Sequence, residues 1–165
     1  MISITWSGPT RLYTFAPMLR GLLTLATAVV ATLVLGSAAI VGGLLVPGGN
    51  LTNRVARLWS RIVLAVAGIH PTYRGLEHAA GTSPRIFLAN HLSNIDIPAV
   101  AIPLPLTCRF VAKRSLFWLP IFGQAMWIGG FVPIDRGDRS QAIRSLGRAA
   151  QRIRAGASVI LFPEG

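Results

Sequence analysis

An uncharged apolar run from Gly21 to Val46 is the feature that most constrains the fold of this chain. As a helix, its 26 residues would extend roughly 39 Å, whereas the hydrocarbon core of a bilayer is about 30 Å thick. The run is therefore long enough to cross a membrane with some tilt. Its glycines and Pro47 are possible break points, so a re-entrant or hairpin-like insertion is the alternative to a straight span.

A cleaved secretory signal is a competing interpretation, because Arg20 precedes the run and the small residues Ser37, Ala38 and Ala39 lie within it. Signal segments have apolar regions of only about 7 to 15 residues, however. A basic flank that is typical of the cytoplasmic side follows the run, at positions 54, 57 and 61. We therefore expect a membrane location with the active site on the cytoplasmic face, which in a bacterium is the face of the inner membrane.

The charge of the chain indicates an anionic partner. Sixteen Lys and Arg residues oppose five Asp and Glu residues, which gives a formal net charge of +11. Anionic lipid and nucleic acid both satisfy this charge. Cys108 is the only cysteine, so the sequence contains neither a disulfide framework nor a cysteine-based zinc site. We expect Cys108 to be a core residue, and a cysteine nucleophile is the alternative.

A basic amphipathic helix is predicted from Leu51 to Ile69. Apolar residues recur at threes and fours, while Arg54, Arg57 and Arg61 gather on another face. Gly68 is its predicted stop. The helix would either pack on the domain or lie on anionic headgroups. We therefore expect residues 1–68 to form an N-terminal membrane-associated helical segment.

Short apolar runs separated by helical segments characterise the rest of the chain. Strands are predicted at 72–74, 86–89, 109–112, 131–134 and 158–162, with the run at 86–89 buried on both faces. A helix is predicted at 140–155, with its apolar residues inward and its arginines in one row: Ile143, Leu146, Ala150 and Ile153 inward; Arg144, Arg148 and Arg152 in the row. This pattern predicts an α/β domain at 69–165, with a mixed sheet flanked by helices and incomplete at its C-terminus.

A histidine and an aspartate follow the strand predicted at 86–89. Residues five apart on one helix diverge, so we expect His91 in a loop and Asp96 in the first turn of the next helix. Asp96 can then accept a hydrogen bond from one imidazole nitrogen and leave the other free as a base. The spacing of Ser93 and Asp96 also fits a helix capping box, in which Asp96 would be only structural.

Charged residues also follow other predicted strands, at Lys113, Arg136 and Glu164. Because sites in α/β sheets lie beyond the carboxyl ends of the strands, we expect these residues to share one mouth with His91. Lys113 and Arg114 together would suit a phosphate, and solvated surface charges are the alternative.

Three motifs in order resemble the glycerolipid acyltransferases, specifically the 1-acylglycerol-3-phosphate acyltransferases. His91-Leu92-Ser93-Asn94-Ile95-Asp96 resembles their first motif, a histidine followed by four residues and an aspartate. The later matches are Gly130-Phe131-Val132-Pro133-Ile134-Asp135-Arg136 and Phe162-Pro163-Glu164-Gly165, and Phe110-Val111-Ala112-Lys113 is also similar. The resemblance covers about residues 50 to 165. Because the third motif of the family usually continues beyond Gly165, we expect a C-terminally truncated member.

The resemblance implies acyl transfer from acyl-CoA or acyl-carrier protein to the sn-2 hydroxyl of 1-acylglycerol-3-phosphate, which gives phosphatidic acid for phospholipid biosynthesis. It implies no cofactor or metal, and its expected partners are the lipid bilayer, lysophosphatidic acid and the acyl donor, but not nucleic acid. His91 and Asp96 would be catalytic. The implied substrate-binding residues are Phe131, Ile134, Arg136, Glu164 and Gly165, with Asn90, Ser93 and Lys113 as further candidates.

Other chemistries remain alternatives at this point. Ser93 would be the nucleophile of an acyl-enzyme route, although a helix cap explains it better. A different lyso-lipid acceptor would need the same motifs. A basic membrane-binding or nucleic-acid-binding fragment would account for the charge, but a 26-residue apolar run is unexpected in a nucleic-acid binder. A metal hydrolase is the least favoured, because His91 and Asp96 lack a convincing third ligand.

Overall fold

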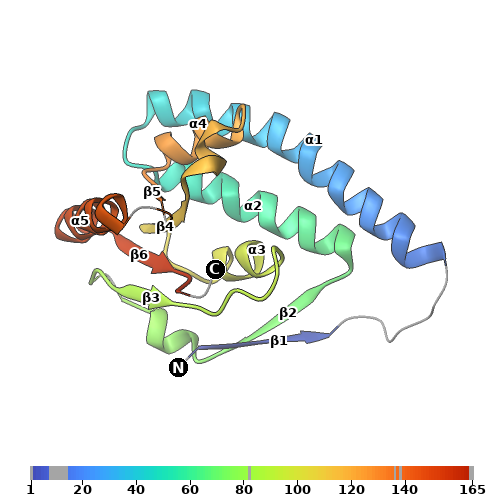
Figure 1. Ribbon diagram of the computed structural model, residues 1–165. Helices are drawn as coiled ribbons and strands as arrows, with labels where there is room; N and C mark the ends of the chain where they lie inside the picture. The colour runs from blue at the N-terminus through green and yellow to red at the C-terminus, as the bar shows by residue number, and fades with distance from the viewer. Residues whose placement is uncertain (1, 8–14, 82, 136, 138, 164–165) are drawn as a thin grey trace.

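The computed structural model describes residues 2–7, 15–81, 83–135, 137 and 139–163 (Figure 1). A four-stranded sheet lies at its centre, with the strand order β3-β6-β4-β5. These strands are β3 (Ile86–Leu88), β4 (Cys108–Lys113), β5 (Val132–Ile134) and β6 (Ser158–Leu161). All three pairings are parallel, with Phe87 opposite Ile160 and Val111 opposite Val132. The predicted α/β class is confirmed.

Helices cover both faces of this sheet. Its flanking elements are η1 (Leu76–Ala79), α3 (Asp96–Ala101), η2 (Arg114–Trp118), α4 (Phe122–Ile128) and α5 (Arg139–Arg154). One core cluster combines Phe110, Ile160 and Phe162 with α3 residues. The other combines Val111, Val132 and Val159 with Ala149 of α5. The sheet is therefore a two-sided core, with α3 and α5 on opposite faces (Figure 1).

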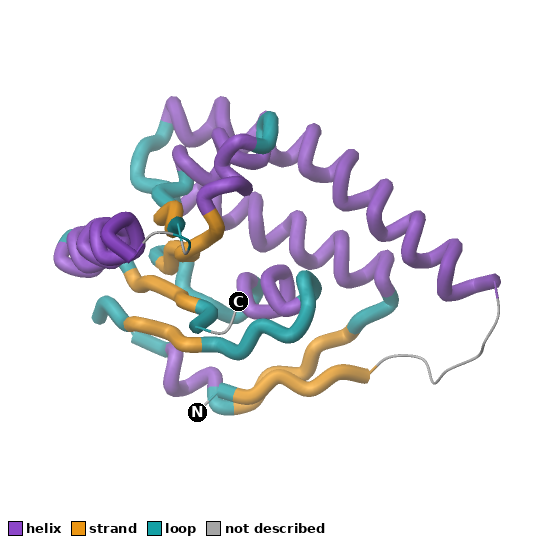
Figure 2. Tube along the Cα trace, in the orientation of Figure 1, coloured by secondary structure: helices purple, strands orange, loops and turns teal. Residues whose placement is uncertain are grey.

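A separate antiparallel pair joins the two ends of the N-terminal region (Figure 2). β1 (Ser3–Ser7) pairs with β2 (His70–Arg74), with Thr5 opposite Thr72. β2 extends the strand predicted at 72–74. The prediction from sequence missed β1, although residues 3–7 alternate polar and apolar side chains in the way typical of a half-buried strand.

The apolar run forms a continuous helix, α1 (Phe15–Leu45). Its glycines do not break it, and three of them are close contact points: Gly36 and Gly43 for the two ends of α4, and Gly42 for Leu51 of the next helix. A Cβ atom on Gly36 would lie 2.7 Å from Ile121 Cγ2, and one on Gly43 would overlap Ile128. Among the described residues, one helix is long and apolar enough to cross a membrane, from Met18 to Leu45. Only 17% of its most apolar window is buried, unlike the core helix of a soluble protein.

The basic helix is α2 (Asn50–Ala67), which runs back along α1. It ends as predicted, because Gly68 adopts the left-handed conformation at φ 67° and its N–H donates to Ala65 and Leu64 carbonyls. The predicted apolar face is only partly correct, since Leu58 is exposed while Thr52 and Ser60 are buried. The reason is that α2 packs on both α1 and α3, so that two faces are covered.

Arg57 of α2 also departs from the predicted basic face. Its guanidinium donates to the Leu104 carbonyl in the segment that follows α3. Burial lowers the pKa of Arg57, and the nearby positive charge of Arg61 lowers it further by a smaller amount. Arg54 and Arg61 remain exposed.

Two predictions of burial were wrong. β3 is an edge strand, so Ile86 and Leu88 are 58% and 69% exposed and only Phe87 packs on the core. On α5, Ile143 and Leu146 are exposed, whereas Ser145 and Ala149 are buried. Small side chains let this helix approach the sheet closely, where Arg148 donates to the Pro133 carbonyl. Ile153 does pack on the core as predicted.

A buried arginine connects the helical hairpin to the sheet. Arg109 of β4 is 5% exposed. Its guanidinium donates to the Leu106 carbonyl at 2.7 Å, the Gly48 carbonyl at 2.6 Å and Asn50 Oδ1 at 3.0 Å. Burial lowers the pKa of Arg109, so these acceptors are needed to hold its charge.

We expect Arg109→Met to destabilise the protein by about 2 to 4 kcal/mol, because it leaves buried acceptors without their donor. Urea unfolding of the full chain in detergent, followed by tryptophan fluorescence, measures the change. Arg154→Met is the matched control, since Arg154 is exposed in the last turn of α5. Equal stability of the two variants would contradict this role of Arg109.

Candidate active site

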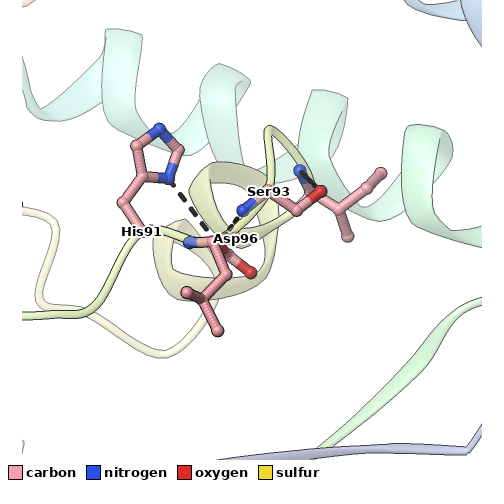
Figure 3. Close-up of polar contacts among 5 residues, drawn as sticks. His91, Ser93 and Asp96 are labelled. Carbon is pink, nitrogen blue, oxygen red and sulfur yellow. Dashed lines mark hydrogen bonds and ion pairs between the residues drawn. The ribbon is translucent and has the colours of Figure 1, made fainter. Parts of the chain in front are cut away.

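The loop between β3 and α3 is organised by the carboxylate of Asp96. Asp96 Oδ2 accepts hydrogen bonds from the backbone N–H groups of Leu92 at 2.8 Å and Ser93 at 2.7 Å. Asp96 is the first residue of α3, so its side chain reaches back over the turn that precedes the helix. This contact holds the loop that carries His91 (Figure 3).

The same carboxylate oxygen faces His91. His91 Nδ1 lies 3.6 Å from Asp96 Oδ2, and the two side chains are 22% and 17% exposed. Nδ1 is buried and has no hydrogen-bond partner. If His91 Nδ1 and Asp96 Oδ2 moved about 0.6 Å closer together, they would lie at the ordinary hydrogen-bond distance of about 3.0 Å. The other ring nitrogen points away from Asp96 (Figure 3), so it is the one available for proton transfer.

The predicted capping box forms only in part. Its carboxylate half is present, in the bond from the Ser93 N–H to Asp96. Ser93 Oγ instead accepts from the Ile95 N–H at 3.3 Å, and the N-cap of α3 is Ile95 without a side-chain bond. The hydroxyl points away from the imidazole (Figure 3). Asp96 therefore combines the structural role and the contact with His91, which the sequence left as alternatives.

Aromatic rings support the imidazole from the side of the sheet. The centroid of the His91 ring lies 4.9 Å from that of Phe162, which follows β6. Phe162 packs in turn on Phe110, at 6.3 Å between centroids, and Phe110 lies 5.4 Å from Phe131. The histidine is thus held between a polar loop and an apolar core.

His91 opens on a large cavity of about 1380 Å³. α2 forms one wall with Trp59 and Ser60, and α3 and α4 form others. Lys113 and Arg114, both exposed, lie where β4 passes into η2. The lining is mainly apolar and lies against the α1–α2 hairpin, which suits a lipid substrate with a charged end.

The predicted binding residues divide into three groups. Lys113, Phe131 and Ile134 line the His91 cavity. Asn90 lines a different pocket of about 420 Å³, beside Ile2 and Ile4, and Ser93 supports the loop. The remaining predictions lie outside the described residues: Arg136, Glu164 and Gly165.

The sequence did not reveal the wall that α2 and α4 contribute. Trp59 and Ser60 of α2, and Phe122 and Met126 of α4, face the cavity. A helical period predicts which residues share a face, but not which of two packed faces borders a cavity. Within the described part of the chain, no three His, Cys, Asp or Glu side chains lie close enough together to hold a metal ion.

Cys108 is the first residue of β4 and is 1% exposed. Burial raises the pKa of its thiol to about 12, with nearby Arg109 acting in the opposite direction. Such a thiol is neutral at physiological pH and unreactive.

Comparison with known proteins assigns this arrangement to a class. The acyltransferase family matches residues 70–165, more than half of the chain, so the chain belongs to the acyltransferase family. A chloroplastic 1-acyl-sn-glycerol-3-phosphate acyltransferase of Arabidopsis thaliana is 34% identical over 67% of this chain. The alpha form of Mus musculus is 34% identical over 73%, and the enzyme so named in Haemophilus influenzae is 30% identical over 67%.

The matched region is less than half of each relative, at 31%, 43% and 46% of their respective lengths. No solved structure matches the chain significantly. The predicted family is confirmed, and the described residues include one helix long and apolar enough to cross a membrane.

Cys108 in the native protein should resist alkylation at pH 8, because a pKa of about 12 leaves only about one thiol in ten thousand ionised. The measurement is mass spectrometry after iodoacetamide treatment, before and after denaturation. We expect modification only after denaturation. Rapid alkylation of the native protein would restore the cysteine-nucleophile alternative.

Proposed function

We propose that this protein transfers a fatty acyl group from an acyl thioester to the sn-2 hydroxyl of 1-acylglycerol-3-phosphate, giving phosphatidic acid. The observation that carries the proposal is the His91–Asp96 pair at an apolar cavity that borders a membrane-type helix hairpin. The names of the plant, mammalian and bacterial relatives support this acceptor.

In the proposed mechanism, His91 is the general base. The ring nitrogen that faces away from Asp96 takes the proton of the acceptor hydroxyl as its oxygen attacks the thioester carbonyl carbon. The C–S bond then breaks, and the proton passes from His91 to the leaving thiolate. Asp96 holds the tautomer with its N–H on Nδ1 and stabilises the imidazolium that forms. General-base assistance of this kind contributes about 10² to 10⁴-fold.

The proposed acyl-chain site continues from the cavity toward α1. A small apolar pocket of about 80 Å³ lies between α1, α2 and α4, and it shares part of its lining with the His91 cavity. The shared residues are Ala56, Trp59, Phe122, Met126 and Phe131. Trp59 Nε1 donates to Thr32 Oγ1 of α1 at 3.0 Å, which ties the two helices together beside this pocket. Burying methylenes there would supply binding energy for a fatty acyl chain.

For the charged end of the acceptor, we propose that Lys113 and Arg136 contact the phosphate, and that Glu164 and Gly165 help to bind the glycerol phosphate. Support comes from the position of Lys113 on the lining of the His91 cavity. Phe131 and Ile134 would then contact the glycerol region from the same side. Acyl-CoA and acyl-carrier protein both satisfy the need for a thioester donor, and the reaction needs no further cofactor.

We also propose that α1 lies in the membrane with the active site on the cytoplasmic face, as in a bacterial inner membrane. The exposed apolar surface of α1 and the exposed Arg54 and Arg61 on the neighbouring helix support this orientation. Other lysophospholipids reaching the site from the same membrane are the closest alternative acceptors. A panel of lyso-lipids with different headgroups separates them from 1-acylglycerol-3-phosphate.

Replacing the base should abolish most of the activity. We expect His91→Ala to lower kcat by about 10³-fold, and Asp96→Asn by about 10²-fold because the tautomer is no longer held. The assay is transfer of a labelled acyl group to lysophosphatidic acid by membranes containing the protein. His78→Ala is the matched control, since His78 is exposed in η1. Retained activity in His91→Ala would refute the base assignment, and an acyl-enzyme that is trapped only while Ser93 is present would favour the covalent route.

Filling the proposed acyl site should shorten the preferred chain. Ala56→Leu adds bulk where the pocket meets the cavity. If the added side chain displaces two methylenes, the loss is about 1.6 kcal/mol, or roughly tenfold in kcat/KM for the longest accepted chain. Competition between acyl thioesters of different lengths measures this shift. Ala65→Leu, on the exposed face of α2, should leave the preference unchanged, and an unchanged preference in both variants would exclude this pocket.

A further inference from the structure

A second pocket, which the proposed mechanism does not use, lies between η2, β5 and α5. Its volume is about 270 Å³. Three guanidinium groups line it: Arg114 from η2, and Arg144 and Arg148 from the arginine row of α5. The other polar lining residues are Asp135, Gln141 and Ser145. Three positive groups against one carboxylate leave an excess of two positive charges on the described lining, which favours an anionic ligand.

Hydrogen bonds hold two of these arginines in place. Arg114 Nη1 donates to Gln141 Oε1 at 2.7 Å. Arg148 Nη2 donates to Ser145 Oγ at 2.8 Å and to the Pro133 carbonyl at 3.2 Å. Because a guanidinium has five N–H donors, these contacts orient each group while leaving donors for a ligand. Oriented guanidinium groups are well suited to phosphate.

Two indole rings complete the pocket. Trp118 and Trp127 line it and are 77% and 55% exposed. Exposed aromatic faces beside arginines match a ligand that combines a planar base with phosphate groups. A phosphate alone would not use the indole faces.

The pocket adjoins the His91 cavity. Arg114, Trp118 and Asp135 line both spaces, so η2 is the partition between them. If the acyl carbonyl of a thioester lies near His91, the polar end of the thioester must extend out of the cavity. On the other side of η2 lies the positively charged pocket, which suits a polar end that carries phosphate groups. α5 packs on β5 and β6, whereas the apolar helix α1 packs on α2 and α4, which favours a soluble ligand over a lipid headgroup.

We propose that this pocket binds the phosphate-bearing nucleotide end of a coenzyme A thioester, which makes acyl-CoA the donor. The inference rests on the proposed acyl transfer. It assigns Arg144 and Arg148 of α5 to the donor, and Lys113 to the acceptor.

The test measures donor binding in the full chain in detergent. Arg144→Gln/Arg148→Gln should raise the KM for acyl-CoA about tenfold, at about threefold for each charge contact at a partly exposed site. The KM for lysophosphatidic acid should not change. Arg144→Gln alone should raise the KM for acyl-CoA about threefold. This substitution removes none of the hydrogen bonds described above. Arg154→Gln, which removes the same charge from an exposed position on the same helix, should behave as the parent protein.

A binding measurement is independent of turnover. Adenosine 3′,5′-bisphosphate, the nucleotide end of coenzyme A, should quench tryptophan fluorescence saturably in the parent protein, and about tenfold more weakly in the double variant. If the KM for acyl-CoA is unchanged in the double variant and in Arg144→Gln, the inference is overturned, whereas the proposed acyl transfer stands. The inference is also overturned if the parent protein uses only acyl-carrier protein as its donor. A double variant that no longer binds phosphatidylglycerol vesicles but keeps its KM for acyl-CoA would overturn it as well. If no thioester is turned over but the nucleotide binds in this pattern, the proposed function fails and the pocket assignment stands.

Discussion

The site depends on two hydrogen bonds, which the carboxylate of Asp96 accepts from the backbone N–H groups of Leu92 and Ser93. A loop between a strand and a helix has many conformations available, and these two hydrogen bonds select one. They also fix the position of the charge that His91 faces. One side chain thereby shapes the loop and supplies the electrostatic partner of the histidine, so structure and chemistry cannot be separated at this position.

The remainder of the fold surrounds this loop with two different environments. The parallel sheet and its aromatic residues support the imidazole from one side. The α1–α2 hairpin closes the cavity from the other, and buried Arg109 connects the turn of that hairpin to β4. The proposed transfer of an acyl group to a lipid acceptor would use both surfaces, because its substrates have apolar and charged parts. Lys113 and Arg114 lie on the cavity lining where β4 passes into η2, and Arg144 and Arg148 of α5 line the adjoining pocket.

Much of the architecture was predictable from local pattern. The strands of the sheet, the long apolar helix, the stop at Gly68 and the helix after position 138 follow from apolar runs, periodicity and turn chemistry. Burial was less predictable. Ile86 and Leu88 are as apolar as core residues but lie on an edge strand, and strand order depends on contacts distant in sequence. On α5 the small residues Ser145 and Ala149 face the sheet, because the helix lies so close to the sheet that only small side chains fit between them.

The sequence by itself determined the family, the α/β class, the long apolar helix near the N-terminus and the candidate pair His91 and Asp96. These depend on residue identity and short spacing, which are local properties. Only the tertiary structure decided that Gly36 and Gly43 of α1 pack against the ends of α4 within an unbroken helix. It likewise decided that Asn90 faces another pocket, and that Arg114, Arg144 and Arg148 meet around one space. The reason is that such contacts depend on how helices pack across a sheet, which the pattern along one segment does not encode.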